Sequence, residues 1–489
     1  DAIIPELQSL KELGITAIEL MPVAQFPGDR NWGYDGVGLF AVQNSYGGPT
    51  GLKRLVDACH QIGLAVVLDV VYNHMGPEGN YLCDFGPYFT EQYHTFWGPA
   101  LNFDGPDSDE VRRFFLENAL YWQREFHIDA LRLDAVHAIR DASAVPFLQE
   151  LSRVTRQQAE RLNRRFHLIA ESDLNNPRLI LPESLGGYGL DSQWSDDFHH
   201  CLRVLLTGEQ SGYYSDFGGT NLFAKTFREG YAYTGEYSQH RRRRHGAPAR
   251  LNPSKQFVVF SQNHDQIGNR MLGDRLSQSA SFEDLKLAAG AVLLSPFIPL
   301  LFMGEEYGEP APFQYFISHT DTKLVEAVRK GRREEFSSFG WEGEVPDPQA
   351  VSTFNACKLN RELRFQESHQ VLYEFYQELI HLRKSVPAIA EADKENLEVQ
   401  NSEAQKTLFL RYWSNQSEVC MLFCFADEAV EAILEIPAGR WVKLLDSATE
   451  RWNGKGSRVP ETVSSNEQVR LNLNPKSFIV LQRVQEEKE

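Results

Sequence analysis

Apolar residues in the first 300 positions of the 489-residue chain follow two alternating patterns. Short runs rich in β-branched and aromatic residues are typical of buried strands, and longer segments with apolar positions three or four apart are typical of helices. The strand-like runs cover residues 15–20, 65–71, 129–134, 167–171, 192–196, 256–262 and 299–304. The helical segments between them include residues 51–63, 108–126 and 281–294. This alternation predicts parallel strands joined by helical crossovers.

Seven such strands predict an α/β fold, a (β/α)8 TIM-type barrel whose first strand is missing from this chain. The opening segment, PELQSLKELG, has a helical pattern with no strand before it. A loop rich in Gly, Pro and aromatic residues at about 75–106 and a second segment at about 198–255 interrupt the alternation as insertions. With a further helix at 371–386, we assign residues 1–394 to a catalytic barrel.

The composition changes near residue 395, where the segments become short, rich in β-formers and separated by turn residues. TLFLRYW, CMLFCF and SFIVLQRV are examples. This pattern predicts a C-terminal antiparallel β domain, similar to a β-sandwich, over residues 395–489. The basic run RRRRHG at 241–246 is typical of a solvated helix end.

The composition restricts the partners and the compartment of the protein. A net charge of −18 argues against nucleic acid or an anionic membrane as partner, and it fits a neutral substrate. No apolar run approaches the roughly 18–20 residues that a membrane helix needs. Six scattered cysteines without ligand or disulfide spacing favour a reducing compartment, so we expect a cytoplasmic protein. The pair His199–His200 has no further spaced ligands, and we expect no metal and no cofactor.

Polar residues follow five of the predicted strands at their carboxyl ends. In a parallel barrel these ends meet at the open mouth, where the loops carry the chemistry. One polar strand end could be a simple turn, but five on one barrel predict a single pocket. The residues in question are Asp69, Asn73 and His74; Arg132 and Asp134; Glu171, Ser172 and Asp173; Asp196, Asp197 and His199; and His264 and Asp265.

Three of these carboxyl groups fit the roles that retaining cleavage of an acetal requires. One carboxylate attacks the anomeric carbon, and a second, about 5–5.5 Å away, protonates the leaving oxygen. Arg132 favours the ionised form of its neighbour Asp134, while a nearby carboxylate and an apolar wall would raise the pKa of Glu171. Asp265 can stabilise the positive charge of the transition state.

Aromatic and histidine side chains add candidate sugar contacts. DRNWGYDGV (29–37) follows the strand at 15–20 and places Trp32 and Tyr34 at the mouth, where a flat ring can pack on a pyranose. A purely structural role for these rim aromatics is the alternative. His74 and His264 are suited to hydrogen bonding with sugar hydroxyls.

Four segments resemble, in order, the conserved regions of the α-amylase superfamily, glycoside hydrolase family 13. They are DVVYNH (69–74), ALRLDAVHA (130–138), LIAESD (168–173) and QNHD (262–265). NWGYDGV, AESDLNNPR (170–178), QWSDDFHH (193–200) and SQNHDQIGNR (261–270) are similar to the patterns of one branch of that superfamily, which releases trehalose. The resemblance implies that Asp134 is the nucleophile, Glu171 the proton donor and Asp265 the transition-state stabiliser.

Strand ends, rim aromatics and the resemblance together give a set of candidate substrate contacts. They are Trp32, Tyr34, Asp69, His74, Arg132, His137, Asp196, Asp197, His199, His264, Gln266 and Asn269.

The resemblance also implies a reaction, part of trehalose biosynthesis. It is the hydrolysis of the α-1,4-glucosidic bond next to the terminal trehalose of a malto-oligosyltrehalose, and related α-1,4-glucans are further substrates. A transglycosidase such as a glycogen-branching enzyme would share the fold and the carboxyl groups, because its glycosyl-enzyme intermediate is the same. A catalytically inactive glycan-binding barrel is an alternative of another class, against which the three intact carboxyl groups argue.

Overall fold

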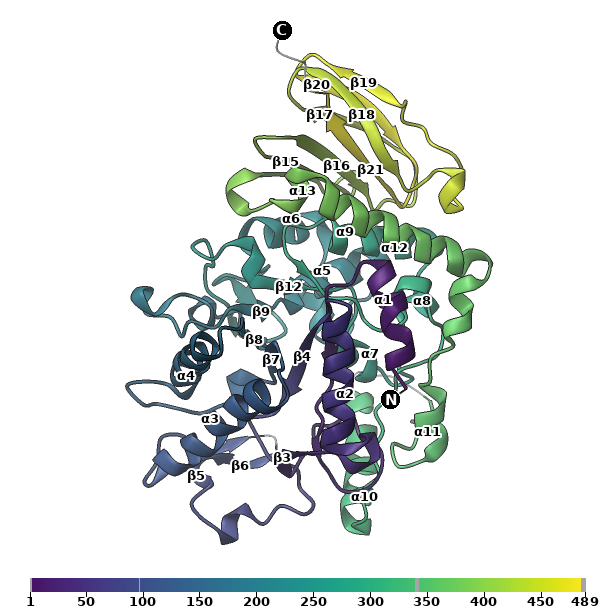
Figure 1. The fold of residues 1–489 in the computed structure, drawn as a ribbon. Helices are drawn as coiled ribbons and strands as arrows, with labels where there is room; N and C mark the ends of the chain where they lie inside the picture. The colour runs from purple at the N-terminus through teal and green to yellow at the C-terminus, as the bar shows by residue number, and fades with distance from the viewer. Residues whose placement is uncertain (1, 96, 339–342, 485–489) are drawn as a thin grey trace. The chain divides into compact units, whose positions relative to one another are not determined.

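The structure is a computed structural model that describes residues 2–95, 97–338 and 343–484. The chain divides into two compact units. The first unit holds residues 1–194 and 314–356, and the second holds residues 195–313 and 357–489. Figure 1 shows the helices and strands of both.

The first unit is built on a parallel sheet of five strands. In sheet order they are β1 (Ala17–Leu20), β4 (Ala65–Val70), β7 (Ala130–Leu133), β8 (His167–Ala170) and β9 (Ser192–Trp194). The helices between successive strands are α2 (Gly48–Gln61), α3 (Ser108–Glu125) and α4 (Phe147–Leu162), and they lie outside the sheet in Figure 1. Ala130 of β7 pairs with Val67 of β4 and with His167 of β8, so the carboxyl ends of these strands lie at the same edge.

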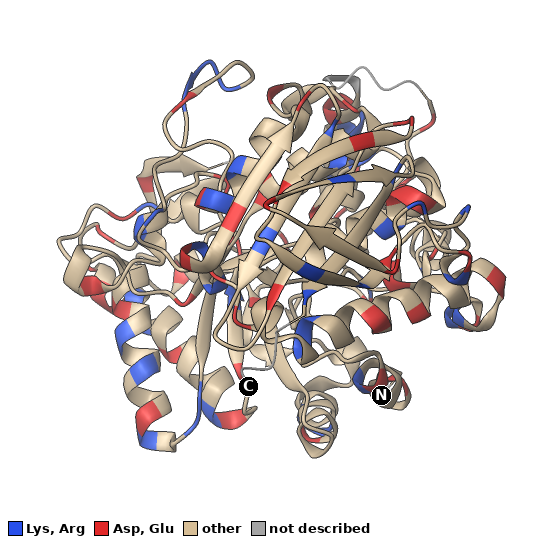
Figure 2. Cartoon of the chain, turned by 90° about the horizontal axis from the view of Figure 1, so that it is seen from above, with Lys and Arg blue, Asp and Glu red and all other residues tan. Residues whose placement is uncertain are grey.

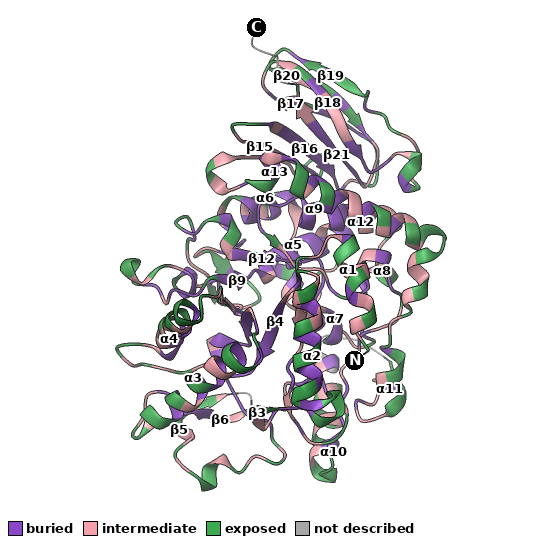
Figure 3. Ribbon diagram, in the orientation of Figure 1, coloured by how far each residue is buried: buried purple, intermediate pink, exposed green. Residues whose placement is uncertain are grey.

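Burial explains why these segments form these elements. Strand β4 is buried at five of its six positions, as expected for a parallel strand covered on both faces. Helix α2 buries Leu52, Leu55, Val56 and Cys59, which are spaced three or four apart on one face. Figure 3 shows the same division, with buried residues along the strands and exposed residues on the outer faces of the helices.

The remaining elements of the first unit surround this sheet. They are α1 (Leu7–Leu13), the paired strands β2 (Ala24–Gln25) and β3 (Gly38–Val42), α10 (Thr322–Ser338) and α11 (Val351–Ala356). The insertion at 75–106, expected as a loop, contains an antiparallel hairpin of β5 (Phe89–Thr95) and β6 (Gly98–Leu101). Strand β6 itself begins with Gly98 and Pro99, and only about half of the side chains in the two strands are apolar, so this composition concealed the hairpin.

The second unit carries the last two parallel strands, β12 (Phe257–Val259) and β13 (Ile298–Pro299). The strand expected to reach residue 304 ends at Pro299, although the Leu300 N–H still donates to the Val259 carbonyl oxygen at 2.9 Å. The helices of its α/β part are α5 (Asp196–Thr207), α6 (Gly219–Glu229), α7 (His264–Gly268), α8 (Leu276–Ser279) and α9 (Phe282–Leu293).

The basic run at 241–246 is not a helix end, as the sequence pattern suggested. Two of its arginines form β11 (Arg243–Arg244), which pairs with β10 (Tyr237–Ser238). Arg242 takes a left-handed conformation, with φ of 53°, at the turn between the two strands. The hairpin keeps three arginines in solvent, so their charges do not have to be desolvated.

After α12 (Glu367–Ser385) and α13 (Pro387–Ala390), the second unit ends in antiparallel sheets. The larger sheet has the order β14 (Leu397–Ser402), β15 (Thr407–Trp413), β16 (Glu418–Cys424), β21 (Ser477–Arg483), β18 (Gly439–Asp446) and β19 (Thr462–Ser465). The smaller sheet pairs β17 (Val430–Glu435) with β20 (Gln468–Leu473). Both sheets contribute to one core, which includes Leu422, Leu434 and the fully buried Trp441.

These elements confirm the predicted fold class: parallel strands with helical crossovers, followed by an antiparallel C-terminal β region. The seven parallel strands divide into five in the first unit and two in the second. Lysine and arginine are interspersed with aspartate and glutamate over the elements visible in Figure 2. No helix in the described part of the chain is both long and apolar enough to cross a membrane. The six cysteines, which all lie in the described part of the chain, form no disulfide; Cys83 is exposed and the other five are buried.

Candidate active site

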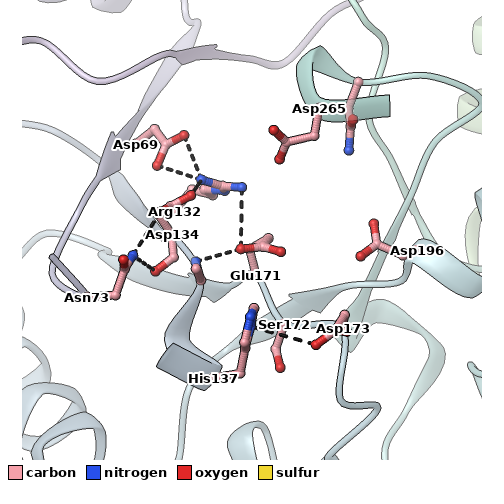
Figure 4. Close-up of polar contacts among 12 residues, drawn as sticks. Asp69, Asn73, Arg132, Asp134, His137, Glu171, Ser172, Asp173, Asp196 and Asp265 are labelled. Atoms are coloured by element: carbon pink, nitrogen blue, oxygen red, sulfur yellow. Dashed lines mark hydrogen bonds and ion pairs between the residues drawn. The ribbon is translucent and has the colours of Figure 1, made fainter. Parts of the chain in front are cut away.

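Arg132 is the centre of a group of carboxylates at the carboxyl edge of the first unit's sheet. Its guanidinium is fully buried, and Nη1 donates to Asp134 Oδ1 at 2.7 Å and to Asp69 Oδ2 at 2.9 Å. Its Nη2 lies 3.7 Å from Glu171 Oε2. The guanidinium carbon also lies 4.5 Å from the centre of the Trp194 ring, which supports it by a cation–π contact. One cation therefore contacts three acidic side chains from neighbouring strands (Figure 4).

Asp134 is held in its ionised form. Burial alone would raise the pKa of this carboxyl, but the charge of Arg132 and hydrogen bonds from Arg132 and Asn73 outweigh burial and lower it. Asn73 donates from Nδ2 to Asp134 Oδ2 and to its backbone carbonyl, both at 2.8 Å. An ionised, oriented carboxylate is what nucleophilic attack on an anomeric carbon requires.

Both carboxylate oxygens of Asp69 accept hydrogen bonds from other side chains of the protein. Both accept from Arg132, and Oδ2 also accepts from the Tyr34 hydroxyl at 2.7 Å. Burial raises the pKa of Asp69 well above its ordinary value, the charge of Arg132 opposes this, and the negative charge of Asp134 adds to it. Asp69 and Tyr34, both predicted as substrate contacts, are thus joined to each other beneath Arg132.

Glu171 is tied to the residue that follows Asp134. Its Oε2 accepts a hydrogen bond of 2.5 Å from the backbone N–H of Ala135. Ala135 has φ of 40°, a left-handed conformation that alanine rarely adopts. The side chain of Glu171 is 14% exposed, so it can meet a substrate while most of it remains desolvated. The two predicted catalytic carboxyl groups of this unit are therefore linked through both Arg132 and a short backbone segment.

His74 lies beside Asp134 and is covered by an aromatic ring. Its Nδ1 shares a hydrogen bond with Asn73 Oδ1, and its Nε2 lies 3.0 Å from the Tyr34 carbonyl oxygen. Burial lowers the pKa of His74, while the charge of Asp134 and the hydrogen bond to the Tyr34 carbonyl oxygen oppose this shift. The ring of Trp97 stacks on it, with centroids 4.2 Å apart and an interplanar angle of 2°.

Trp97 is a residue that sequence reasoning missed. It lies at the turn of the β5–β6 hairpin and is 51% exposed, so an aromatic surface borders the site on the solvent side. The aromatic content of the insertion was the only signal available, and it did not distinguish Trp97 from Tyr81 or Phe85.

Trp32 is placed differently from the open rim position expected for it. It is 4% exposed, and its indole N–H donates to the Gln314 carbonyl oxygen at 3.1 Å. Its ring packs edge-on against Tyr315. The flat faces of Trp32 are thus covered by the protein.

His137 is partly open to solvent. Its side chain is 32% exposed, and Nδ1 lies 3.9 Å from Asp173 Oδ1. A cavity of about 150 Å³ opens beside it. The cavity is lined by His137 together with Val136, Ile139, Phe147, Ser172, Leu174 and Tyr188.

In the second unit, two residues predicted to contact the substrate form hydrogen bonds with buried groups of the protein instead. Asp197 accepts the backbone N–H groups of Ala232 at 2.8 Å and Tyr233 at 3.0 Å. His199 lies between the Ser261 carbonyl oxygen, 2.7 Å from Nδ1, and the Tyr214 hydroxyl, 2.9 Å from Nε2. Burial lowers the pKa of His199 to about 3. These contacts join α5 to its neighbours within the unit.

The segment QNHD (262–265) contains the N-cap and the first two residues of helix α7. Asn263 caps this helix by accepting the Gln266 N–H at 2.7 Å. Asp265, in the first turn, is 40% exposed, and its Oδ2 lies 3.4 Å from His264 Nε2.

Gln266 and the end of helix α7 complete this group. Gln266 lies between the Tyr213 hydroxyl, at 3.2 Å, and Asp196 Oδ1, at 3.5 Å. Asn269 is exposed at the end of the helix, where its backbone N–H donates to the Asp265 carbonyl oxygen. Asp265, Asp196, Gln266 and Asn269 thus keep polar groups accessible.

Within residues 2–95, 97–338 and 343–484, no group of three or more His, Cys, Asp or Glu side chains is arranged to hold an ion.

Comparison with known proteins identifies relatives across most of the chain. The family profile of the alpha amylase catalytic domain matches residues 1–99. The malto-oligosyltrehalose trehalohydrolase of Saccharolobus solfataricus is 50% identical over 384 residues, which are 78% of this chain and 65% of the relative. That of Arthrobacter ramosus is 50% identical over 394 residues, 80% of this chain and 68% of the relative.

A more distant relative and a solved structure extend the comparison. The 1,4-alpha-glucan branching enzyme of Geobacillus stearothermophilus is 30% identical over 320 residues, 61% of this chain and 45% of the relative. A crystal structure of a candidate alpha amylase from Salmonella typhimurium matches with a TM-score of 0.86 and 37% sequence identity. The match covers 99% of this chain and 79% of the Salmonella chain.

Proposed function

Since the chain belongs to the malto-oligosyltrehalose trehalohydrolases of the α-amylase superfamily, we propose that it hydrolyses the α-1,4-glucosidic bond next to the terminal trehalose of malto-oligosyltrehaloses. The products would be trehalose and a shortened malto-oligosaccharide. One observation carries this proposal: the Arg132 guanidinium contacts both Asp134, whose pKa is lowered, and Glu171. This arrangement supports a nucleophile and an acid acting on the same glycosidic bond.

In the proposed first step, Asp134 attacks the anomeric carbon of the glucosyl unit while Glu171 gives its proton to the glycosidic oxygen. The bond to trehalose breaks, trehalose leaves with that proton, and the malto-oligosaccharide remains as an ester on Asp134. In the second step, Glu171 takes a proton from water, and the hydroxide replaces Asp134 at the anomeric carbon. The configuration is retained because the carbon is inverted twice.

Asp265 has a proposed role in both steps. As an exposed carboxylate in the first turn of α7, it is available to stabilise the positive charge of the oxocarbenium-like transition state. His74, His137, His264, Asp196, Gln266 and Asn269 remain our proposed substrate contacts. We propose that Asp69 and Tyr34 act on Arg132 and that Trp32 supports the fold of the first unit. We propose that Asp197 and His199 support the fold of the second unit.

Trp97 is a further proposed contact. Because one of its faces covers His74 and half of its surface is exposed, the exposed part of the ring is accessible to a sugar. We also propose a cytoplasmic location, which the six cysteines outside any disulfide support.

Product analysis by chromatography tests the function. The protein is incubated with a malto-oligosyltrehalose and, separately, with a plain malto-oligosaccharide of the same length. Rapid release of free trehalose from the first substrate, with slow attack on the second, is the expected result. Longer or branched products from the plain oligosaccharide would instead identify a transglycosidase, because a sugar hydroxyl would then replace water in the second step. Glu171→Gln, which lacks the acid, separates this activity from that of a contaminant.

A further inference from the structure

Residues 314–321 lie along the loop that carries Tyr34, within the first unit. Besides the bond from Trp32 to the Gln314 carbonyl oxygen, Ser318 Oγ donates to Asp29 Oδ1 at 2.8 Å and accepts the Asp29 N–H at 3.0 Å. Gly28 faces Ser318 so closely that a Cβ atom there would lie 2.0 Å from the Ser318 carbonyl oxygen. Only glycine allows this approach, so the two segments are fitted to each other.

His319 lies at the centre of this contact. Its side chain is 1% exposed, and its ring lies between two carboxylates. Nδ1 is 3.2 Å from Glu78 Oε2, and Nε2 is 3.6 Å from Asp35 Oδ2. Glu78, 241 positions away in the sequence, also accepts the backbone N–H groups of Thr320 at 3.0 Å and Asp321 at 3.1 Å.

The backbone of His319 is fixed as well. Gln349 donates from Nε2 to the His319 carbonyl oxygen at 2.8 Å, and its Oε1 accepts the His319 N–H at 3.2 Å. These two bonds fix the main chain from which the imidazole reaches the two carboxylates.

A continuous series of contacts leads from His319 to the proposed nucleophile. Asp35 is the residue after Tyr34, whose hydroxyl donates to Asp69 and whose carbonyl oxygen faces His74 Nε2. Asp69 in turn accepts from the same Arg132 nitrogen that donates to Asp134. Displacement of Asp35 would carry Tyr34 with it and would withdraw the hydroxyl from Asp69.

We propose that His319 is a positioning residue of this enzyme: it holds Asp35 and Glu78 so that Tyr34 stays on Asp69 and Arg132 stays aligned with Asp134. It does not touch the substrate. The assignment rests on the proposed function, because the reaction is what Asp134 and Glu171 carry out.

A double-mutant cycle in the full chain tests this role. Trehalose release is measured for the wild type, His319→Gln, Tyr34→Phe and the double variant. We expect His319→Gln to lower kcat about tenfold with KM changed less than twofold. In the Tyr34→Phe background the same substitution should lower kcat by no more than about twofold. Losses of kcat that multiply independently in the double variant would overturn the proposal.

His60→Gln is the matched control. His60 also pairs with a carboxylate, Asp129 Oδ2 at 2.8 Å, but it lies at the end of α2, at the opposite end of the strands from Asp134. We expect its kcat to remain that of the wild type. A loss of kcat in His60→Gln equal to that in His319→Gln would mean that a general loss of packing explains both, and the proposal would fail.

Hydrogen exchange provides a readout that is independent of activity. Amides of residues 29–37 should exchange faster in His319→Gln than in the wild type or in His60→Gln. Unchanged exchange there would contradict the positioning role whether or not the wild type releases trehalose. Absence of trehalose from the wild type would contradict only the proposed function, so the two failures are distinguishable.

Discussion

The carboxylate of Glu171 accepts a hydrogen bond from the backbone N–H of Ala135, the residue that follows Asp134. The proposed acid is thus positioned by the same turn that carries the proposed nucleophile. Ala135 itself takes a left-handed conformation, with φ of 40°. Movement of this turn would therefore disturb the proposed nucleophile and the hydrogen bond that positions the proposed acid.

Replacing Glu171 by Gln should remove the proposed acid while leaving the fold intact. Glutamine keeps an oxygen for the Ala135 N–H but has no proton to give, so the fold should be retained. We expect kcat for trehalose release to fall about 10²–10⁴-fold, the range typical of lost general acid–base catalysis. Steady-state kinetics and circular dichroism measure the two effects. The control is Glu183→Gln, which removes a carboxylate that pairs with Arg153 elsewhere in the same unit. Full activity in Glu171→Gln would rule out its role as the acid.

Replacing Asn73 by Ala should change the pH dependence of the reaction. The Asn73 hydrogen bond is one of the interactions that lower the pKa of Asp134, so its loss should raise that pKa. Asp134 would then become protonated at a higher pH, and the acid limb of the kcat/KM profile should move toward neutral pH.

Asn118→Ala is the control for the Asn73 experiment. Asn118 is equally buried and is bonded to the Tyr72 hydroxyl at 2.7 Å. Its loss should destabilise the protein without moving the acid limb. A profile for Asn73→Ala that superimposes on that of the wild type would contradict the proposed link between Asn73 and Asp134.

Replacing Trp97 by Ala should weaken substrate binding more than chemistry. A stacked aromatic pair contributes about 0.5–1.5 kcal/mol beyond buried area, so we expect KM for malto-oligosyltrehalose to rise about tenfold at the upper end. Trp97→Phe should recover part of the loss because a flat ring is retained. Phe85→Ala, which removes an aromatic residue 80% exposed in the same insertion, should leave KM unchanged. An equal rise in both alanine variants would mean that the effect is not specific to the His74 contact.

The parallel strands and the acidic residues at their ends could be predicted because both are visible in short, contiguous stretches of the sequence. Each strand is a short apolar run, and Asp69, Arg132 with Asp134, and Glu171 lie in or immediately after such runs. Parallel pairing then brings these ends to one edge without further information. The bond from Glu171 to Ala135 depends on one backbone conformation, and residue types alone do not specify it.

What could not be predicted depends on contacts between distant segments. Trp32 was expected at an open rim, but Gln314, 282 positions later, covers its indole. The contact of His319 with Glu78 spans 241 positions and links two loops with no shared pattern. Trp97 reaches His74 only because the insertion forms a hairpin. In each case the contact depends on how distant segments pack in the folded protein, and the local hydrophobic pattern carries no information about that.

His199 should make the protein sensitive to acid well above the pH at which carboxylates are protonated. Its pKa is lowered by burial to about 3, whereas in the unfolded chain it is near the ordinary value of about 6.5. As the pH falls below 6.5, the unfolded chain binds a proton that the folded protein excludes. The free energy of unfolding should therefore decrease by up to about 1.4 kcal/mol per pH unit from this residue, down to about pH 3.

Denaturant unfolding between pH 7 and pH 4 measures this contribution. His199→Gln cannot take up the proton, so its stability should fall less steeply with decreasing pH than that of the wild type. Tyr214→Phe is the control, because it removes the hydroxyl that faces His199 Nε2 but keeps the imidazole. That variant should lose stability at every pH while retaining the steep wild-type slope. If His199→Gln and the wild type had parallel slopes, burial of a neutral His199 would not be the source of the acid sensitivity.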